Sequence, residues 1–516
     1  MNMKVSEMSD WTEGYVADIA YTYGYYGELN PSRVRLAFLQ QGLACPEFGT
    51  ACELGFGQGL STNLHAAASV TQWHGTDFNP VQAGFAQELA SASGNGAKLY
   101  DEAFDEFCNR PDLPDFDYIG LHGIWSWISD DNRRVIVDFI RKKLKVGGVL
   151  YISYNTLPGW AAFAPMRHLL TEHAEVMGAE GGGIVNRIDG AMAFADKLIQ
   201  TNPLYARANP QVADRLKKMQ AQNRHYLAHE YFNRDWHPMH FATMAEWLKD
   251  AKVQFACSAH YFDAIDAVNL SADQQAFLKD IPDTMFRQSV RDFMVNQQFR
   301  KDYWVKGARK ITDLEKIEGV RRQKIILTTP RENVPMKITA VLGEVTLQEA
   351  IYGPLLEALA DHKVHAIADL ERSLKSKGIQ FNQMFQAVIL LVGAGHIALV
   401  QEESAQASKA CKALNVHLMH KARSSSDVPY LASPVVGGGF VVGRFQQLFL
   451  MGLKAGKKTP AEWAQFVWEI LQAQGQRVIK EGKLVENAED NLAELTRLAQ
   501  LFADQQLPIL KGLQIA

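Results

Sequence analysis

The sequence predicts an α/β fold whose first 160 residues form a parallel, doubly wound sheet. Short apolar segments alternate there with helical ones, and strands separated by helices of this length pair in parallel. A glycine-rich turn, Gly55–Gly59, directly follows the first expected strand. The acidic residue Asp77 ends the second strand. The last two features predict a ligand site at the carboxyl edge of the sheet.

Each expected element has its own local signal. The strands are short and mostly apolar: Thr50–Leu54, Trp73–Asp77, Lys98–Tyr100, Phe116–Leu121 and Val149–Ser153. The helices between them are Pro31–Gln41, Leu60–Ala68, one that begins at Pro80, and Asn132–Leu144. The last helix is amphipathic, and we expect it to end at Lys145-Val-Gly-Gly148, since glycine is typical after a helix end.

A helical segment interrupts this pattern. Residues 165–235 look helical, apart from Gly181-Gly-Gly183. The helix Phe241–Ala251 and the strands Val253–Ser258 and Phe299–Val305 then resume the α/β pattern. We therefore interpret residues 165–235 as an insertion. The alternatives for it are a cover over the active site and a contact in a homodimer.

The last third of the chain has a different character. Three expected helices and a strand follow residue 350, an order that resembles a winged helix: Ile351–Asp361, Ala366–Lys375, Asn382–Val392 and His396–Val400. Phe440–Ala516 is mostly helical. The expected segments are 1–164 (core sheet), 165–235 (helical insertion), 236–311 (remainder of the first region), 312–410 (winged-helix-like, α+β) and 411–516 (mostly helical).

Composition excludes several classes of function. The 516 residues carry a net charge of −4, which does not favour nucleic acid or an anionic membrane. Between Gly378 and Ser408 there is no Lys or Arg, so the winged-helix-like module lacks the basic residues that DNA binding requires. Met1–Asp10 has no signal-peptide pattern, and Ala387–Val400 is too short to span a bilayer. We expect a cytoplasmic protein.

The cysteines and histidines do not predict a disulfide or metal site. The five cysteines are scattered and form no C-x-x-C pair: Cys45, Cys52, Cys108, Cys257 and Cys411. His225, His229, Glu230, His237 and His240 cluster in the sequence, but they lack the H-E-x-x-H spacing. No metal is therefore expected.

The spacing of the glycines selects the ligand. A dinucleotide fingerprint needs Gly-x-Gly-x-x-Gly, but glycines 55, 57 and 59 are followed by Leu60. With Glu53 two residues upstream, the pattern suits a nucleoside without phosphates, and we expect S-adenosylmethionine. Asp77, 18 residues after Gly59, is placed to accept from a ribose hydroxyl. The alternative is a tight turn that binds nothing.

The third strand leads to the expected adenine site. A carboxylate at Glu102 would accept from the adenine amino group, and the backbone at Ala103 would donate to the ring; Glu102 is equally well explained as a solvated loop charge. The expected cofactor contacts are Glu53, Gly55, Phe56, Gly57, Gln58, Asp77, Phe78, Glu102, Ala103 and Leu121.

Three further segments supply expected catalytic side chains. The fourth strand leads into His122-Gly-Ile-Trp-Ser-Trp127, whose aromatic rings suit the sulfonium or a cationic substrate, although one tryptophan belongs in the core. After the fifth strand, Asn155 either orients a nucleophile or caps a turn. Tyr21-Thr-Tyr-Gly-Tyr-Tyr-Gly27 is either a lid or an arm packed on the sheet. The expected catalytic residues are Tyr21, Tyr26, His122, Trp125, Trp127 and Asn155.

Together these segments resemble the bacterial class I methyltransferases that carry a C-terminal methyltransferase regulatory domain. The resemblance covers most of the chain and rests on Glu53–Gly59, His122–Trp127, Ser153–Trp160, Arg291-Asp-Phe293 with Phe299-Arg-Lys-Asp302, and Tyr430–Pro434. Within that group the chain is similar to the rickettsial-type lysine methyltransferases of outer-membrane proteins. Phe56 departs from the pattern, because many relatives have Cys or another small residue there.

The resemblance implies a fold and a reaction. It implies a Rossmann-like class I methyltransferase domain with a helical insertion, which binds S-adenosylmethionine, and a regulatory region at 236–311. We expect N-methylation of protein lysine, with His122 the only ready proton acceptor among the candidate side chains. The alternatives are methylation of a small-molecule or glycan hydroxyl, with His122 as base, and a non-catalytic sensor of S-adenosylmethionine.

Overall fold

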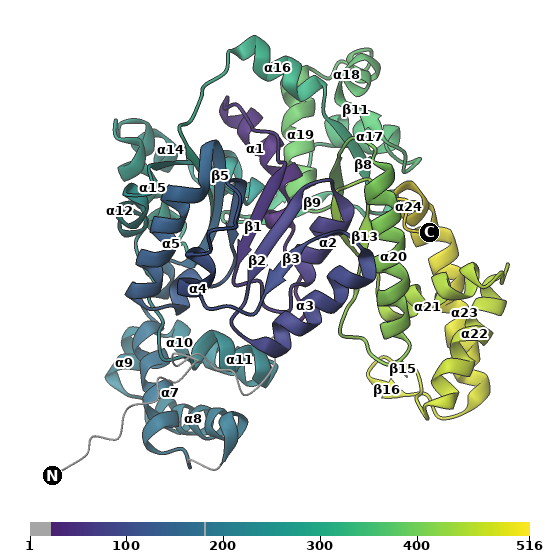
Figure 1. Ribbon diagram of the computed structural model, residues 1–516, viewed down its shortest axis with the longest axis horizontal. Coiled ribbons are helices and arrows are strands. Elements are labelled where there is room, and N and C mark those ends of the chain that lie inside the picture. The colour runs from purple at the N-terminus through teal and green to yellow at the C-terminus, as the bar shows by residue number, and fades with distance from the viewer. Residues whose placement is uncertain (1–21, 180–181) are drawn as a thin grey trace.

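The computed structural model describes residues 22–179 and 182–516, and its centre is a seven-stranded sheet (Figure 1). The strand order is β3-β2-β1-β4-β5-β7-β6; β1 to β5 are parallel, and β7 runs antiparallel to both of its neighbours. The strands are β1 Thr50–Leu54, β2 Gln72–Thr76, β3 Lys98–Tyr100, β4 Phe116–Leu121, β5 Leu144–Asn155, β6 Val253–Ser258 and β7 Phe299–Lys306. The predicted parallel sheet is confirmed, and its order reverses between β1 and β4, where ligands of open α/β sheets bind.

Helices cover both faces of this sheet. They are α1 Pro31–Gln41, α2 Leu60–Ala68, α3 Pro80–Ser93, α4 Phe104–Cys108 and α5 Asp130–Lys143. Tyr118 of β4 packs in one core with Phe38 of α1, whereas its neighbour Ile119 packs in another core with Ile136 of α5. Adjacent strand residues point to opposite faces, so β4 is buried on both sides.

Asparagine caps fix where two of these helices begin. The Asn30 side chain accepts a hydrogen bond from the backbone N–H of Ser32 at 2.9 Å, just before Pro31. Asn79 accepts from the N–H of Val81 at 3.0 Å, just before Pro80. A cap followed by proline at the first helical position needs no tertiary support, which explains why the sequence located both helix starts.

The expected helix end is correct to within one residue, since α5 ends at Lys143, but the glycine cap expected at residues 145–148 is wrong. β5 begins at Leu144, immediately after α5, and Leu144 pairs with Phe116 of β4. Gly147 has a φ of +84°, and the register shifts between Phe116 and Tyr118. The two glycines therefore allow an irregularity inside the strand and do not cap the helix.

Helices occupy the segment between β5 and β6, as the sequence indicated. They are α6 Leu157–Trp160, α7 Ala164–Val176, α8 Gly183–Gln200, α9 Leu204–Ala208, α10 Gln211–Gln220 and α11 Arg224–Tyr231. These helices share a core of their own that includes Met166, Ile188 and Leu216. Figure 1 shows them gathered at one end of the sheet.

The chain then returns to the sheet and continues into a middle region. Before and after β6 lie α12 Phe241–Lys249, η3 Tyr261–Ala264, α13 Asp266–Asn269, α14 Ala272–Lys279 and α15 Thr284–Met294. The middle region contains α16 Asp313–Arg321, β8 Lys324–Leu327, β9 Lys337–Ala340, β10 Gly343–Thr346, α17 Glu349–Ala358, β11 His365–Ala366, α18 Ile367–Lys375, α19 Phe381–Gly393 and β12 Ile397–Val400. A three-stranded antiparallel sheet, β11-β8-β12, lies at its centre. The winged-helix assignment stays a prediction.

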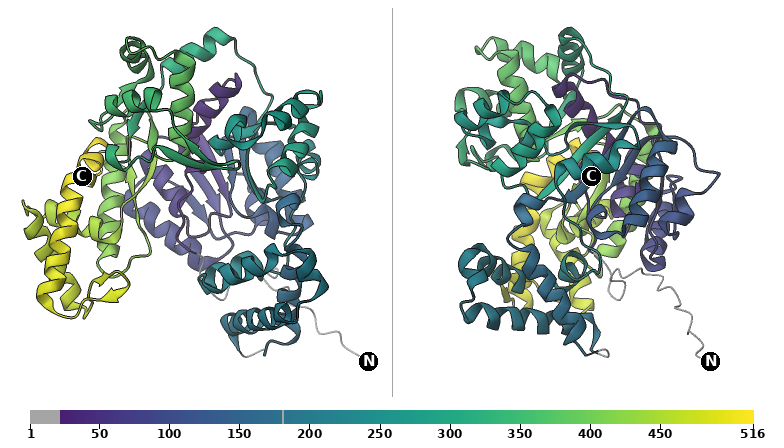
Figure 2. Two further views of the ribbon diagram at one scale, coloured as in Figure 1. Left: turned by 180° about the vertical axis from the view of Figure 1, so that it is seen from behind. Right: turned by 90° about the vertical axis from the view of Figure 1, so that its left-hand side faces the viewer.

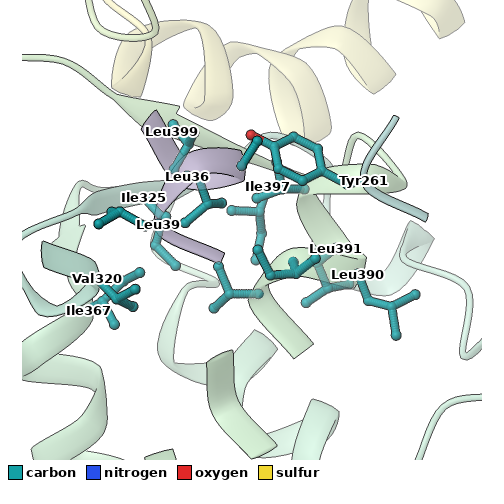
Figure 3. Packing of buried hydrophobic residues seen from close by; sticks show 14 of the residues in the cluster. Leu36, Leu39, Tyr261, Val320, Ile325, Ile367, Leu390, Leu391, Ile397 and Leu399 are labelled. Atoms are coloured by element: carbon teal, nitrogen blue, oxygen red, sulfur yellow. The ribbon is translucent and has the colours of Figure 1, made fainter. Parts of the chain in front are cut away.

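One continuous core joins the middle region to α1. Leu36 and Leu39 of α1 lie beside Ile325 of β8 and Leu399 of β12 (Figure 3). Tyr261 belongs to the same core, and its hydroxyl donates to the backbone oxygen of Arg33 at 2.6 Å. The middle region therefore covers the α1 face of the sheet.

The C-terminal region packs against α2 and α3. It contains α20 Ala405–Ala422, β13 Tyr430–Ser433, β14 Gly438–Val441, α21 Arg444–Lys454, α22 Pro460–Ala473, β15 Ile479–Lys480, β16 Lys483–Leu484, α23 Ala488–Leu501, the π-helical turn η5 Phe502–Gln506 and α24 Leu507–Gly512. Leu60 and Leu64 of α2 share a core with Leu414 and Leu431. Figure 2 shows this region and the insertion at separate places around the sheet. No helix in the described part of the chain is long and apolar enough to cross a membrane.

A buried ion network ties β7 to its neighbours. The guanidinium of Arg300 donates to Asp302 at 2.9 Å and to Asp292 of α15 at 2.6 Å. Asp302 also accepts from the hydroxyl of Tyr154 in β5 at 3.0 Å. All these side chains are buried, so each charge depends on its partners.

Replacing Arg300 with methionine is therefore expected to destabilise the protein strongly. The variant Arg300→Met would leave two buried carboxylates without a cation, which typically costs about 3–5 kcal/mol in the free energy of unfolding. Denaturant unfolding measures the change. Arg322→Met, at an exposed position, is the matched control. Equal stabilities of the two variants would contradict a structural role for the network.

Candidate active site

The turn after β1 presents bare backbone at the carboxyl edge of the sheet. Gly55, Gly57 and Gly59 have φ values of +71°, +59° and +64°, a region that disfavours other residues. A Cβ on Gly55 would lie 2.7 Å from a side-chain carbon of Ile124, and one on Gly59 would lie 2.4 Å from the Cβ of Ala86. The turn therefore requires glycine both for its conformation and for space.

Two buried carboxylates flank this turn. Asp77 accepts from the backbone N–H of Gly57 at 2.8 Å and from that of Asn79 at 3.1 Å. Glu53 accepts from the hydroxyl of Thr62. Burial raises the pKa of Asp77 to about 7 and that of Glu53 to about 8. A carboxylate has about four acceptor positions, so Asp77 retains the capacity to bind ligand hydroxyls.

Glu102 lies beyond the end of β3 and is partly buried. One carboxylate oxygen pairs with the guanidinium of Arg110 at 2.5 Å, and that guanidinium also lies 4.2 Å from the centre of the Tyr100 ring. The other oxygen, Oε2, is buried and has no hydrogen-bond partner among the described residues. A buried acceptor without a partner is costly, and a ligand amino group would satisfy it.

A cavity of about 570 Å³ lies over the turn and extends to the insertion. Of the predicted cofactor contacts, it is lined by Glu53, Gly55, Phe56, Gly57, Gln58, Asp77, Phe78, Glu102 and Ala103. Leu121 is buried in the core at the end of β4, directly before His122. The structure thus brings the predicted cofactor residues other than Leu121 to one cavity.

Four of the predicted catalytic residues also line this cavity: Tyr26, His122, Trp127 and Asn155. The rings of Tyr26 and His122 stack with their centres 3.7 Å apart. His122 Nδ1 lies 2.8 Å from the hydroxyl of Tyr151, and burial lowers the pKa of His122 to about 3. The imidazole is therefore neutral at ordinary pH.

A contact with α6 orients the side-chain amide of Asn155. Its Oδ1 accepts from the indole N–H of Trp160 at 3.1 Å, which assigns the amide nitrogen to the other side. That nitrogen is buried and has no hydrogen-bond partner in the described part of the chain. Asn155 is therefore more than a turn cap, because it offers an unused donor at the cavity.

Trp125 and Tyr21 do not join this group. Trp125 is fully buried in the core, where its indole N–H donates to the sulfur of Met239 at 3.4 Å and its ring meets Trp247 edge-on. A 3₁₀ turn over Trp125–Trp127 separates the two tryptophans, so only Trp127 reaches the cavity. The expectation of a catalytic role for Trp125 is corrected accordingly. Tyr21 lies outside the described residues.

Residues of the insertion line part of the cavity, which agrees with one of the two roles considered for it, a cover over the active site. Its cavity-lining side chains include Arg215 of α10 and Tyr226, His229 and Glu230 of α11, and Asp235 follows them. Of these side chains, the sequence singled out His229 and Glu230 as part of the histidine cluster, but not Arg215, Tyr226 or Asp235. Among the described residues, no group of three His, Cys, Asp or Glu side chains is arranged to hold a metal ion.

β7 brings a charged pair to the same cavity. Lys301 lines the cavity, and its ammonium group donates to the Glu28 carboxylate at 2.6 Å. Burial alone would raise the pKa of Glu28, but the neighbouring Lys301 holds it at about 2. No spacing signal linked Glu28 to Lys301, since they meet only through the sheet.

Comparisons with known proteins place the chain in a family. A family model described as a predicted methyltransferase regulatory domain matches residues 223–306, from the end of the insertion through β7. The Synechocystis protein sll1526 is 40% identical over 513 residues, which cover 98% of this chain and 100% of that protein. The chain belongs to the sll1526 family. In Rickettsia prowazekii, protein RP789 is 25% identical over 331 residues, covering 62% of this chain and 57% of RP789.

Solved structures support the same fold for the sll1526 family. PKMT2 from Rickettsia typhi, solved in complex with AdoHcy, superposes with a TM-score of 0.70 at 15% identity. The superposition covers 96% of this chain and 100% of PKMT2. The predicted class I methyltransferase fold and the predicted presence of a regulatory domain are confirmed.

The glycine turn itself is open to a direct test. Gly59→Ala is expected to lower the free energy of unfolding by about 1–3 kcal/mol, because the new methyl overlaps Ala86 and the backbone is strained. Gly84→Ala is the control: it lies exposed in α3 with open space around it, and alanine there should stabilise by about 1 kcal/mol. Denaturant unfolding measures the expected decrease in the free energy of unfolding for Gly59→Ala and the expected increase for Gly84→Ala. An unchanged free energy of unfolding in Gly59→Ala would contradict the close approach of Gly59 to Ala86.

Proposed function

We propose that this protein is a methyltransferase that uses S-adenosylmethionine. One observation carries the proposal: a single cavity is lined by the glycine turn and Asp77 together with Asn155 and aromatic side chains. S-adenosylmethionine supplies an electrophilic methyl group on its sulfonium. The protein's task is to hold two reactants in line and to exclude water.

The residues present fit this cofactor at several points. Asp77 has acceptor positions left for the ribose hydroxyls. The unpartnered Oε2 of Glu102 suits the adenine amino group. The glycine backbone leaves room for the ligand to lie against the turn. That PKMT2 was solved with AdoHcy, and shares this fold, further supports the proposal.

Replacing Asp77 tests the proposed cofactor site. Asp77→Ala is expected to weaken binding of S-adenosylhomocysteine roughly 10- to 100-fold, because hydrogen bonds to a charged partner contribute about 1.5–3 kcal/mol. Because the pKa of Asp77 is about 7, wild-type affinity should also fall as the pH drops through that value. The variant should lose much of this pH dependence. Calorimetry measures the affinity for S-adenosylhomocysteine and its dependence on pH.

The matched control is Asp101→Ala, which removes an exposed carboxylate that does not line the cavity. Its affinity is expected to equal that of the wild type. An unchanged affinity in Asp77→Ala would contradict the proposed cofactor position, provided that thermal unfolding shows both variants to be folded.

We further propose that the methyl acceptor is a protein lysine. The acceptor wall combines the rings of Tyr26, Trp127 and Tyr226 with the carboxylates of Glu230 and Asp235, a combination that attracts a cationic side chain. A lysine must lose a proton before it attacks, from a reference pKa of about 10.4. Desolvation among aromatic rings lowers that pKa, so the cavity itself would prepare the amine.

The state of His122 favours an amine over a hydroxyl acceptor. Deprotonation of a hydroxyl needs a general base whose pKa lies near the working pH. His122 has a pKa of about 3, so it is a weak base, although it can orient an acceptor. An amine activated by desolvation needs no such base.

Methyl labelling of whole cells separates the two acceptor classes. Cells with the wild-type protein, fed labelled methionine, are expected to show a labelled protein band that is lost in the Asp77→Ala strain. Hydrolysis and mass spectrometry should then place the label on lysine. A labelled extractable metabolite that depends on Asp77 would overturn the lysine proposal but retain the methyltransferase.

A further inference from the structure

The segment that precedes α1 lies between the cavity and the C-terminal region. Thr22, Gly24 and Tyr26 line the cavity, whereas Tyr25 points away from it into the C-terminal region. Neighbouring side chains of an extended backbone point in opposite directions, and Tyr26 has extended dihedral angles. The position of the Tyr26 ring is therefore linked through one peptide unit to that of Tyr25.

The hairpin β13–β14 receives Tyr25. The Tyr25 ring lies 5.5 Å from the ring of Tyr430 in β13 and 5.2 Å from that of His65 in α2. A Cβ on Gly438 would lie only 2.4 Å from the Tyr25 hydroxyl oxygen, and one on Gly439 would lie 2.9 Å from the ring. The two glycines thus create the space that the tyrosine occupies.

Polar contacts hold this arrangement from both sides. The Asn30 side chain donates to the backbone oxygen of Val436, in the hairpin loop, at 3.1 Å. The backbone N–H of Tyr26 donates to the Ser61 hydroxyl at 2.7 Å, beside the glycine turn. A Cβ on Gly24 would lie 2.4 Å from the Tyr26 hydroxyl oxygen, so the Tyr26 ring also lies tightly against its own segment.

We propose that the β13–β14 hairpin is a latch that positions Tyr26 over the cavity. By holding Tyr25, the hairpin keeps the Tyr26 ring stacked on His122 and the segment closed over the proposed cofactor site. Tyr25 and Gly438 are positioning residues, because they act on the cavity through Tyr26. This inference rests on the proposed function, and it gives the Tyr430–Pro434 motif a role.

Gly438→Ala tests the latch. The added methyl should displace Tyr25 and weaken S-adenosylhomocysteine binding roughly 3- to 10-fold, the range that loss of an aromatic contact produces. Gly443→Ala, just after the same hairpin, is the matched control, since its nearest atom would be 3.9 Å away. Calorimetry measures affinity, and thermal unfolding verifies that each variant is folded.

Rescue distinguishes a latch from general destabilisation. Tyr25→Phe removes the atom that the new methyl of Gly438→Ala would approach most closely, so the double variant should regain part of the lost affinity. Tyr430→Ala removes a ring contact without adding atoms, and it should weaken S-adenosylhomocysteine binding as well. If Gly438→Ala does not fold, Tyr430→Ala tests the latch in its place. Wild-type affinity in folded Gly438→Ala, or in Tyr430→Ala, would overturn the latch. A wild-type protein that binds no S-adenosylhomocysteine would instead overturn the proposed function.

Discussion

The buried carboxylate of Asp77 is the interaction on which the site depends. It bonds to Gly57 and thereby fixes the turn that presents bare backbone to the cavity. Burial raises its pKa to about 7, because the carboxylate charge is costly to desolvate. Ligand hydroxyls would relieve that cost. The same carboxylate therefore fixes the conformation of the turn and would be stabilised by hydrogen bonds from a ligand.

The regions outside the sheet act on the site from different directions. The insertion lines the cavity with Tyr226 and Glu230, next to which we propose that the methyl acceptor binds. The middle region packs on α1 and adds to the core. The C-terminal region packs on α2, the helix that the glycine turn begins, and contacts Tyr25. In the proposed function, the class I fold positions the methyl donor, and the added regions select the acceptor.

The sequence predicted the features that local physics controls. The sequence placed the starts of α1 and α3 at Pro31 and Pro80, and the glycine spacing located the turn and Asp77. The sequence-based prediction failed where tertiary contacts determine the local structure or the position of a side chain. The glycines at 147–148 suited a helix end as well as a strand irregularity, and only pairing with β4 distinguishes the two. Side chains of the insertion reach the cavity because helices pack there, which no residue spacing reveals.

The most direct test of the account is a crystal structure with S-adenosylhomocysteine bound. The account predicts ribose hydroxyls within hydrogen-bond distance of Asp77, the adenine amino group at Glu102 Oε2, and the sulfur facing the wall of Tyr26, Trp127 and Asn155. A ligand bound elsewhere, or one whose ribose makes no contact with Asp77, would contradict it.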